Sequence, residues 1–146
     1  MASLPTPAEI LNRFYEAETE YMLTPPEQRN FSTGWGRTIS SSMVLHQSAD
    51  LPYGGEYHGH EGFLKWTEEM SSRFSTLDVK DPQVFEKEGS DQVMVSSTLE
   101  LTVRKTGQKW IAPMCQTVRV DREKGWITEI RPFYWNVKGL NEALGR

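Results

Sequence analysis

Residues 61–88 read EGFLKWTEEMSSRFSTLDVKDPQVFEKE, and the spacing of the apolar side chains changes within this stretch. The first half repeats its apolar residues every three or four positions, at Phe63, Trp66, Met70 and Phe74. This spacing predicts one face of an amphipathic helix. From residue 75 onward apolar and polar residues alternate, which predicts a strand. The stretch therefore predicts a helix that leads directly into a β-sheet.

Three further segments with a strand pattern follow, at residues 91–105, 109–121 and 126–135. The links between them are short and rich in glycine and polar residues. Because short links join antiparallel neighbours, the four strands are expected to pair in sequence order. Pro113 lies within the third of the four and predicts a bulge or a bend there.

The N-terminal segment predicts an amphipathic helix that begins at Pro7. Thr6 is the expected N-cap, and Glu9 is placed to complete a capping box. Apolar residues then recur at helical spacing, at Ile10, Phe14, Ala17 and Tyr21. The pair Pro25–Pro26 ends this helix.

Residues 24–36 predict a short second helical segment, 40–48 a first strand, 50–60 a turn and 137–146 a short terminal helix. The order of helices before strands predicts an α+β fold. We expect a curved antiparallel β-sheet wrapped on the N-terminal helices, a cystatin-like cone, with a pocket between sheet and helices. With neither a repeat nor a linker, residues 1–146 are expected to form one domain.

The composition argues against several classes of partner. The net charge is −4 and no run of basic residues occurs, which argues against nucleic acid. No apolar stretch is long enough to span a bilayer, and the N-terminus lacks the pattern of a signal peptide. The single cysteine, Cys115, suits a reducing compartment. We therefore expect a soluble, cytoplasmic protein.

The order of predicted helices and strands extends from Pro7 to about Leu144 and includes two motifs. These are LPYGGEYHGHEGFLKW at residues 51–66 and GWITEIRPFYWN at residues 125–136. In this element order they resemble the nuclear-transport-factor-2-like superfamily, and within it the SnoaL-like group of polyketide cyclases and ketosteroid-isomerase relatives. Fungal natural-product isomerases look especially similar. The resemblance implies a cone-shaped SnoaL-like domain, often a homodimer, that needs neither a metal nor an organic cofactor.

The function that this resemblance implies is that of a cofactor-independent isomerase or cyclase. It would act by general acid–base catalysis on a hydrophobic biosynthetic intermediate. Two alternatives stay open: a non-catalytic carrier or protein-interaction module of the same fold, and a dehydratase-type lyase. The number of ionisable side chains facing the pocket separates an enzyme from a carrier, because an unpaired buried charge is costly.

The last strand holds the first catalytic candidates. Strict alternation places Ile127, Glu129, Arg131 and Phe133 on one face. If this face lines the pocket, Glu129 could transfer protons and Arg131 could hold a substrate oxygen. The alternative is an exposed ion pair of little energetic consequence.

Two further candidates precede the sheet. The glycines around Trp35 could let the backbone turn Arg37 inward, and the resemblance implies an arginine near this position that holds a ligand oxygen. The alternative for Arg37 is a solvated loop residue. His46 in the first strand suits proton shuttling near neutral pH, or a structural hydrogen bond.

The expected binding residues are mostly aromatic. Tyr53 could donate a hydrogen bond to a developing oxyanion. The expected lining of the pocket is Trp66, Met70, Trp110, Met114, Gln116 and Phe133, although all of these also suit a hydrophobic core. His58 and His60 lack a carboxylate or cysteine set at a recognised ligand spacing, so no metal site is expected.

Alternation within residues 91–105 also predicts how the sheet is covered. The odd positions carry the apolar residues and predict the core face: Val93, Val95, Leu99, Leu101 and Val103. The even positions are more polar and leave a second face for association. We therefore expect a homodimer.

Overall fold

The computed structural model describes residues 3–146. It contains three α-helices, α1 (Pro7–Leu23), α2 (Gly59–Arg73) and α3 (Val137–Ala143), and two 3₁₀ turns, η1 (Pro26–Gln28) and η2 (Trp35–Thr38). The strands are β1 (Ile39–Gln47), β2 (Gly55–His58), β3 (Phe74–Glu86), β4 (Gln92–Val103), β5 (Lys109–Asp121) and β6 (Trp126–Tyr134). No helix within the described residues is long and apolar enough to cross a membrane.

The six strands form one open sheet in the order β2-β1-β6-β5-β4-β3. From β3 to β6 each strand pairs antiparallel with the next, as the short links predict. β1 runs parallel to β6, so the sheet is mixed. The predicted turn at residues 50–60 is wrong in part, because Gly55–His58 forms β2 and pairs with β1. The predicted α+β class with a curved sheet is confirmed.

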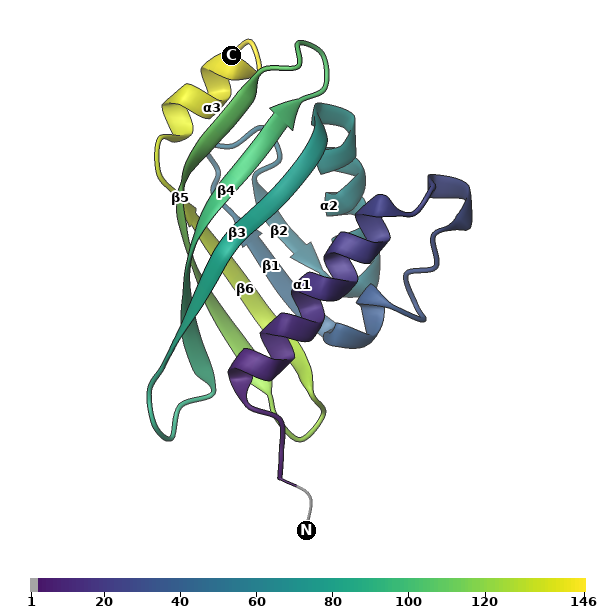
Figure 1. Cartoon of the computed structure of the whole chain (residues 1–146), viewed down its shortest axis with the longest axis vertical. Helices are drawn as coiled ribbons and strands as arrows, with labels where there is room; N and C mark the ends of the chain where they lie inside the picture. Colours follow the sequence, from purple (N-terminus) through teal and green to yellow (C-terminus); the bar gives the residue numbers. More distant parts are fainter. Residues whose placement is uncertain (1–2) are drawn as a thin grey trace.

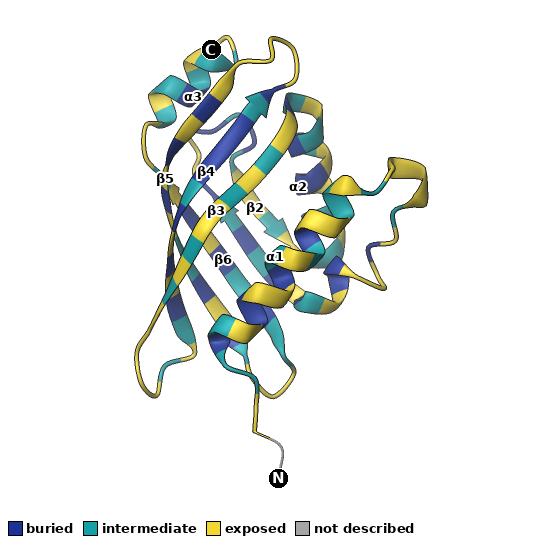
Figure 2. Cartoon of the chain, viewed as in Figure 1, coloured by how far each residue is buried: buried dark blue, intermediate teal, exposed yellow. Residues whose placement is uncertain are grey.

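Helices α1 and α2 lie against the same face of the curved sheet, and α3 lies at the end of the molecule where the chain terminates (Figure 1). In Figure 2 the sides of α1 and α2 that face the sheet are buried and their opposite sides are exposed. The core therefore occupies the concave side of the sheet, between strands and helices.

Local signals explain where α1 begins and ends. The Thr6 side chain accepts a hydrogen bond of 3.1 Å from the backbone N–H of Glu9, as predicted for the N-cap. Thr24 is the C-cap of α1, since its N–H donates to the carbonyls of Glu20 and Tyr21. The chain turns there because Pro25 and Pro26 cannot continue the helix.

The junction between α2 and β3 is as abrupt as the sequence predicts. Phe74 is both the C-cap of α2 and the first residue of β3. Its backbone N–H donates a hydrogen bond to the Met70 carbonyl. Its side chain is buried in the core. A cluster of aromatic rings holds α1, η2 and α2 together, with the rings of Trp35 and Phe63 edge to face at 4.7 Å.

A β-bulge in β6 changes which side chains face the core. Arg119 pairs with Glu129, but the next residue of β5, Val120, pairs with Ile127. Thr128 is therefore an extra residue in β6, and the alternation shifts by one position at that point. Ile127 faces the core before the bulge, and Ile130, Pro132 and Tyr134 face it afterwards. The prediction that Ile127 and Glu129 share a face is wrong for this reason.

The bulge expected at Pro113 does not form, since the pairing of β4 with β5 continues without a shift through Thr98 and Pro113. Pro113 lies opposite the end of β6, where its carbonyl accepts a hydrogen bond from the N–H of Trp135. A missing N–H is tolerated at such a position.

The alternation predicted for β4 is confirmed. Its odd residues are nearly inaccessible to solvent and face the helices: Val93, Val95, Leu99, Leu101 and Val103. Their even neighbours lie on the outer, convex face of the sheet.

Candidate functional site

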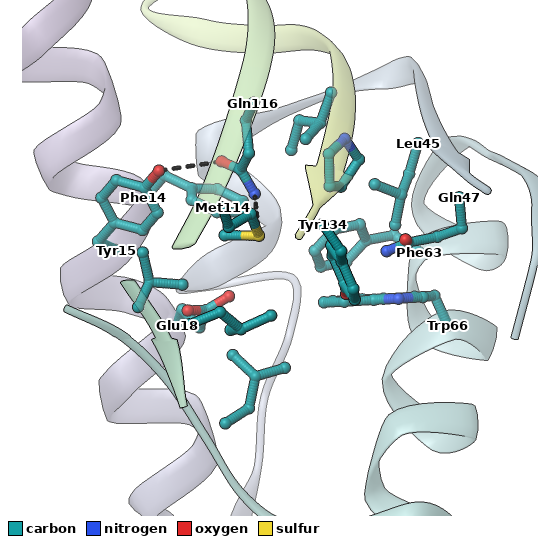
Figure 3. Close-up of a pocket in the computed structure, with 15 residues that line it drawn as sticks. Phe14, Tyr15, Glu18, Leu45, Gln47, Phe63, Trp66, Met114, Gln116 and Tyr134 are labelled. Atoms are coloured by element: carbon teal, nitrogen blue, oxygen red, sulfur yellow. Dashed lines mark hydrogen bonds between the residues drawn. The ribbon is translucent and has the colours of Figure 1, made fainter. Parts of the chain in front are cut away.

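A cavity lies between α1, α2 and the concave face of the sheet, with a volume of about 40 Å³ (Figure 3). Side chains from both helices and from five strands line it, and most of them are apolar or aromatic. Its polar lining residues are Tyr15, Glu18, Gln47, Gln116 and Tyr134. A volume of this size holds a small chemical group and not a ring system.

Glu18 provides the cavity's only carboxyl group. The residue is 7% exposed, on the side of α1 that faces the sheet. Burial in apolar surroundings, and secondly the negative charge of Asp78, raise the pKa of Glu18 to about 8. Within residues 3–146 the carboxyl makes no hydrogen bond. At neutral pH it is therefore mostly protonated and free to exchange a proton with a molecule in the cavity.

One wall of the cavity is closed by a hydrogen bond between α1 and β5. The Tyr15 hydroxyl donates to Oε1 of Gln116 at 3.1 Å, and Nε2 of Gln116 lies 4.0 Å from the Met114 sulfur. Burial and, next, the charge of Glu18 raise the pKa of Tyr15 far above its usual range. Tyr15 is therefore a neutral hydroxyl at physiological pH.

The opposite wall is formed by Tyr134 and Gln47. Burial raises the pKa of Tyr134 to about 12, although hydrogen bonds from Tyr53 and Gln47 oppose this shift. The Tyr53 hydroxyl donates to the Tyr134 hydroxyl at 3.1 Å. Oε1 of Gln47 and the Nε1–H of Trp66 are buried without a hydrogen-bond partner in the described part of the chain. One is an acceptor and the other a donor, and such buried groups are usually paired in proteins.

Three of the residues expected to line the pocket do so: Trp66, Met114 and Gln116. Tyr53, Met70 and Trp110 are buried behind the lining. Tyr53 supports Tyr134 through the hydroxyl pair, and the Trp110 ring packs on that of Tyr134 at 5.9 Å. Met70 belongs to the hydrophobic core of α2.

The expected polar floor of Glu129 and Arg131 lies outside the cavity, because the bulge at Thr128 turns both side chains to the outer face. Arg131 and Phe133 are exposed there. Glu129 does meet His46, with Oε2 at 3.2 Å from Nε2, and Arg119 lies on its other side at 3.6 Å. His46 also pairs with Glu56 at 3.4 Å. The structure therefore brings Glu129 and His46 together, but in a network of polar contacts outside the cavity.

Arg37 is exposed on η2, while its neighbours Trp35 and Gly36 are buried. A Cβ atom at Gly36 would lie 2.8 Å from the Phe31 carbonyl oxygen. The glycine thus allows close packing of η2 and does not turn Arg37 inward, so the predicted orientation of Arg37 is wrong.

The two histidines of residues 58–60 have separate partners. His60 Nε2 lies 3.0 Å from the carbonyl oxygen of Ile39, and His58 Nε2 lies 3.2 Å from the Glu56 carboxylate.

Sequence reasoning missed Glu18, Tyr15, Gln47 and Tyr134. For Glu18 a signal was present: it follows Ile10 and Phe14 at intervals of four and so lies on the apolar stripe of α1. A carboxylate within an apolar stripe is a candidate functional residue. Gln47 and Tyr134 carried no comparable signal, since their faces depend on bulges and pairing.

No protein-family model matches the sequence, and no curated protein is significantly similar to it. Solved structures, by contrast, match almost the whole chain. An NTF2-like protein of unknown function from Burkholderia pseudomallei superposes with a TM-score of 0.76 at 13% identity, covering 95% of this chain and 97% of that one. A candidate polyketide cyclase from Xanthomonas campestris gives a TM-score of 0.71 at 14% identity, covering 94% and 95%.

A third structure is a hypothetical protein with a ketosteroid isomerase-like fold from Catenulispora acidiphila, in complex with trimethylamine. It gives a TM-score of 0.67 at 17% identity, covering 90% of this chain and 88% of that one. At such identities the likeness shows the fold alone. The chain has the NTF2-like fold shared by ketosteroid isomerase-like and polyketide cyclase-like proteins.

Proposed function

We propose that this protein is a cofactor-independent isomerase or cyclase that acts by general acid–base catalysis on a hydrophobic biosynthetic intermediate. Glu18 is the proton-transferring residue. The observation that carries this proposal is a single carboxyl group, buried in an apolar cavity, with its pKa raised to about 8. A carboxyl group with a pKa near the ambient pH can both donate and accept a proton during catalysis.

Isomerisation moves a proton from one atom of a substrate to another. In its neutral form Glu18 can protonate a substrate atom, and the carboxylate that remains can accept a proton from a second atom. Since no other carboxyl group lines the cavity, one residue would carry out both steps. The unpaired Nε1–H of Trp66 is available to hold a substrate oxygen on which negative charge develops.

The lining supports a hydrophobic substrate. Aromatic and aliphatic side chains dominate the walls, with only a few polar atoms to orient a ligand. Proteins of this fold include a candidate polyketide cyclase, and also TerC, which was co-crystallised with polyporic acid. Both agree with a natural-product intermediate as the substrate.

Exchange of carbon-bound protons tests the proposal without the natural substrate. Acetone and butanone in deuterated buffer should lose their α-proton NMR signals faster with the wild-type protein than with buffer. Glu18→Gln should abolish this acceleration, since general acid–base catalysis contributes about 10²–10⁴-fold. Glu27→Gln, which removes an exposed carboxylate away from the cavity, is the matched control.

The same experiment separates enzyme from carrier. Saturation-transfer NMR reports whether the ketones bind. Binding without accelerated exchange would favour the non-catalytic carrier over the proposed enzyme.

The proposal includes a homodimer formed through the outer face of the sheet. Large apolar side chains on four adjacent strands of this face are at least half exposed: Phe85, Met94, Ile111 and Phe133. Phe85 and Met94 are direct cross-strand neighbours. A second copy would remove this apolar surface from water.

A further inference from the structure

The described residues that line the cavity include an acid but no basic side chain. Glu18 is its only carboxyl group, and no lysine, arginine or histidine is among its lining residues. The two other titratable groups that line it, Tyr15 and Tyr134, remain neutral because burial raises the pKa of each hydroxyl. Asp78 is a further acid whose charge acts on Glu18. An anionic ligand would therefore find no opposite charge in the cavity, whereas a cation would find a carboxylate.

The walls are suited to a cation as well. Five aromatic rings line this small space, from Phe14, Tyr15, Phe63, Trp66 and Tyr134. Figure 3 shows them around the same opening as the Glu18 carboxyl group. The negative face of an aromatic ring attracts an alkylammonium group, and this attraction is strongest where water is excluded.

Gln47 points to the same ligand chemistry. The residue is 6% exposed, it lines the cavity, and its Oε1 atom has no hydrogen-bond partner among residues 3–146. A buried acceptor without a donor is destabilising unless a ligand supplies one. The N–H of an ammonium group can donate to this oxygen, whereas a carboxylate or an ether on a ligand cannot.

The surface beside the cavity carries the same sign of charge along α1. A groove between α1 and β3 shares Tyr15 and Val79 with the cavity. Its only charged lining residues are Glu16 and Glu20. On the opposite side, an outer cleft shares Gln47, Pro132 and Tyr134 with the cavity and contains both Asp50 and Arg131. The groove is therefore the side from which a cation is electrostatically favoured.

We infer that the cavity binds its substrate through a small protonated amine, held by the Glu18 carboxylate, Oε1 of Gln47 and the surrounding aromatic rings. This inference rests on the proposed function, because it places the substrate against the same carboxyl group. It adds the substrate's chemical class: an apolar molecule with a basic nitrogen, whose remainder extends into the groove between α1 and β3.

Amine binding should be coupled to the titration of Glu18. The free protein holds this carboxyl mostly protonated at neutral pH, since its pKa is about 8. An ammonium group pairs with the charged form, so binding releases a proton from Glu18. The affinity for the amine should therefore rise about tenfold per pH unit below the pKa of Glu18 and level off above it. An alkylammonium group remains protonated throughout this range.

Three probes that share a tert-butyl group test the inference: tert-butylammonium, tert-butanol and pivalate, with charges of plus one, zero and minus one. Titrations should follow the Nε1–H resonance of Trp66, assigned with Trp66→Phe. We expect tert-butylammonium to bind about tenfold more tightly than tert-butanol, and pivalate to bind most weakly. Glu18→Gln should abolish both this preference and its pH dependence, and Glu27→Gln should change neither.

Equal affinity for tert-butylammonium and tert-butanol would overturn the inference, as would a preference for pivalate. Failure of all three probes to shift the Trp66 resonance would overturn it too. None of these results would refute the proposed function, which is decided by proton exchange on neutral ketones. Conversely, selective amine binding without accelerated exchange would leave the binding site in place and remove the catalytic role.

Discussion

The Tyr15 hydroxyl donates a hydrogen bond of 3.1 Å to Oε1 of Gln116 and so joins α1 to β5 beside the Glu18 carboxyl group. The two residues are 101 positions apart in the chain. This bond orients one wall of the cavity, and Gln116 in turn contacts Met114 on the same strand. The polar side of the cavity therefore depends on how α1 packs against the sheet.

Replacing Tyr15 with phenylalanine removes this bond and leaves the half-buried amide oxygen of Gln116 without its donor. We expect Tyr15→Phe to lower the free energy of unfolding by about 1 kcal/mol. Urea denaturation measures this change. Tyr21→Phe is the control, because the Tyr21 hydroxyl makes no hydrogen bond in the described part of the chain. Equal effects of the two substitutions would contradict a stabilising role for the Tyr15 bond.

The raised pKa of Glu18 should also appear in the pH dependence of stability. The group has a pKa of about 8 when folded and an ordinary value of 4.5, so between these values the folded state binds more protons than the unfolded state. Its contribution to stability is therefore complete below the ordinary pKa and is lost as the pH rises towards the folded pKa. We expect the loss to be about 1 kcal/mol per pH unit in this window.

Glu18→Gln should remove this dependence and be more stable than the wild type at the upper end of the window. Urea denaturation of both proteins at several pH values provides the measurement. Glu27→Gln is the control, because it also removes one carboxyl group but at an exposed position. Parallel stability profiles for wild type and Glu18→Gln would show that Glu18 titrates normally.

Glu129 should have little influence on catalysis, because its carboxylate lies on the outer face with His46 and Arg119. We expect Glu129→Gln to retain the rate of α-proton exchange that Glu18→Gln abolishes. The loss of stability should be about 0–1 kcal/mol, as for other solvated ion pairs. Exchange rates measured by NMR in D₂O decide the point. A large loss of exchange in Glu129→Gln would show instead that Glu129, on the outer face, takes part in catalysis.

The proposed homodimer predicts a strong effect of charge on the outer face of the sheet. Phe133→Asp introduces a carboxylate among exposed apolar side chains, and we expect it to weaken dimerisation by at least about tenfold. Sedimentation velocity over a concentration series measures the equilibrium. Leu23→Asp is the control, since Leu23 is 81% exposed at the end of α1. A wild-type protein that is monomeric at micromolar concentrations would remove the dimer from the proposal.

Except for β2, the order and type of the main helices and strands were determined by the sequence itself. The spacing of Phe63, Trp66, Met70 and Phe74 marks the inner side of α2, and strict alternation marks the core face of β4. Both are local properties, since a helix or strand buries whichever side its own apolar residues occupy. The expected lining residues that do lie at the cavity, Trp66, Met114 and Gln116, are on elements whose periodicity is uninterrupted.

Which polar side chains enter the cavity was decided only by the tertiary structure. One extra residue, Thr128, reverses the orientation of everything after it in β6, so that Tyr134 faces inward and Glu129 outward. The position of such a bulge depends on pairing with β5, which local alternation does not encode. Glu18 likewise carries its raised pKa only because α1 lies over an apolar concave sheet, where burial penalises the charged carboxylate.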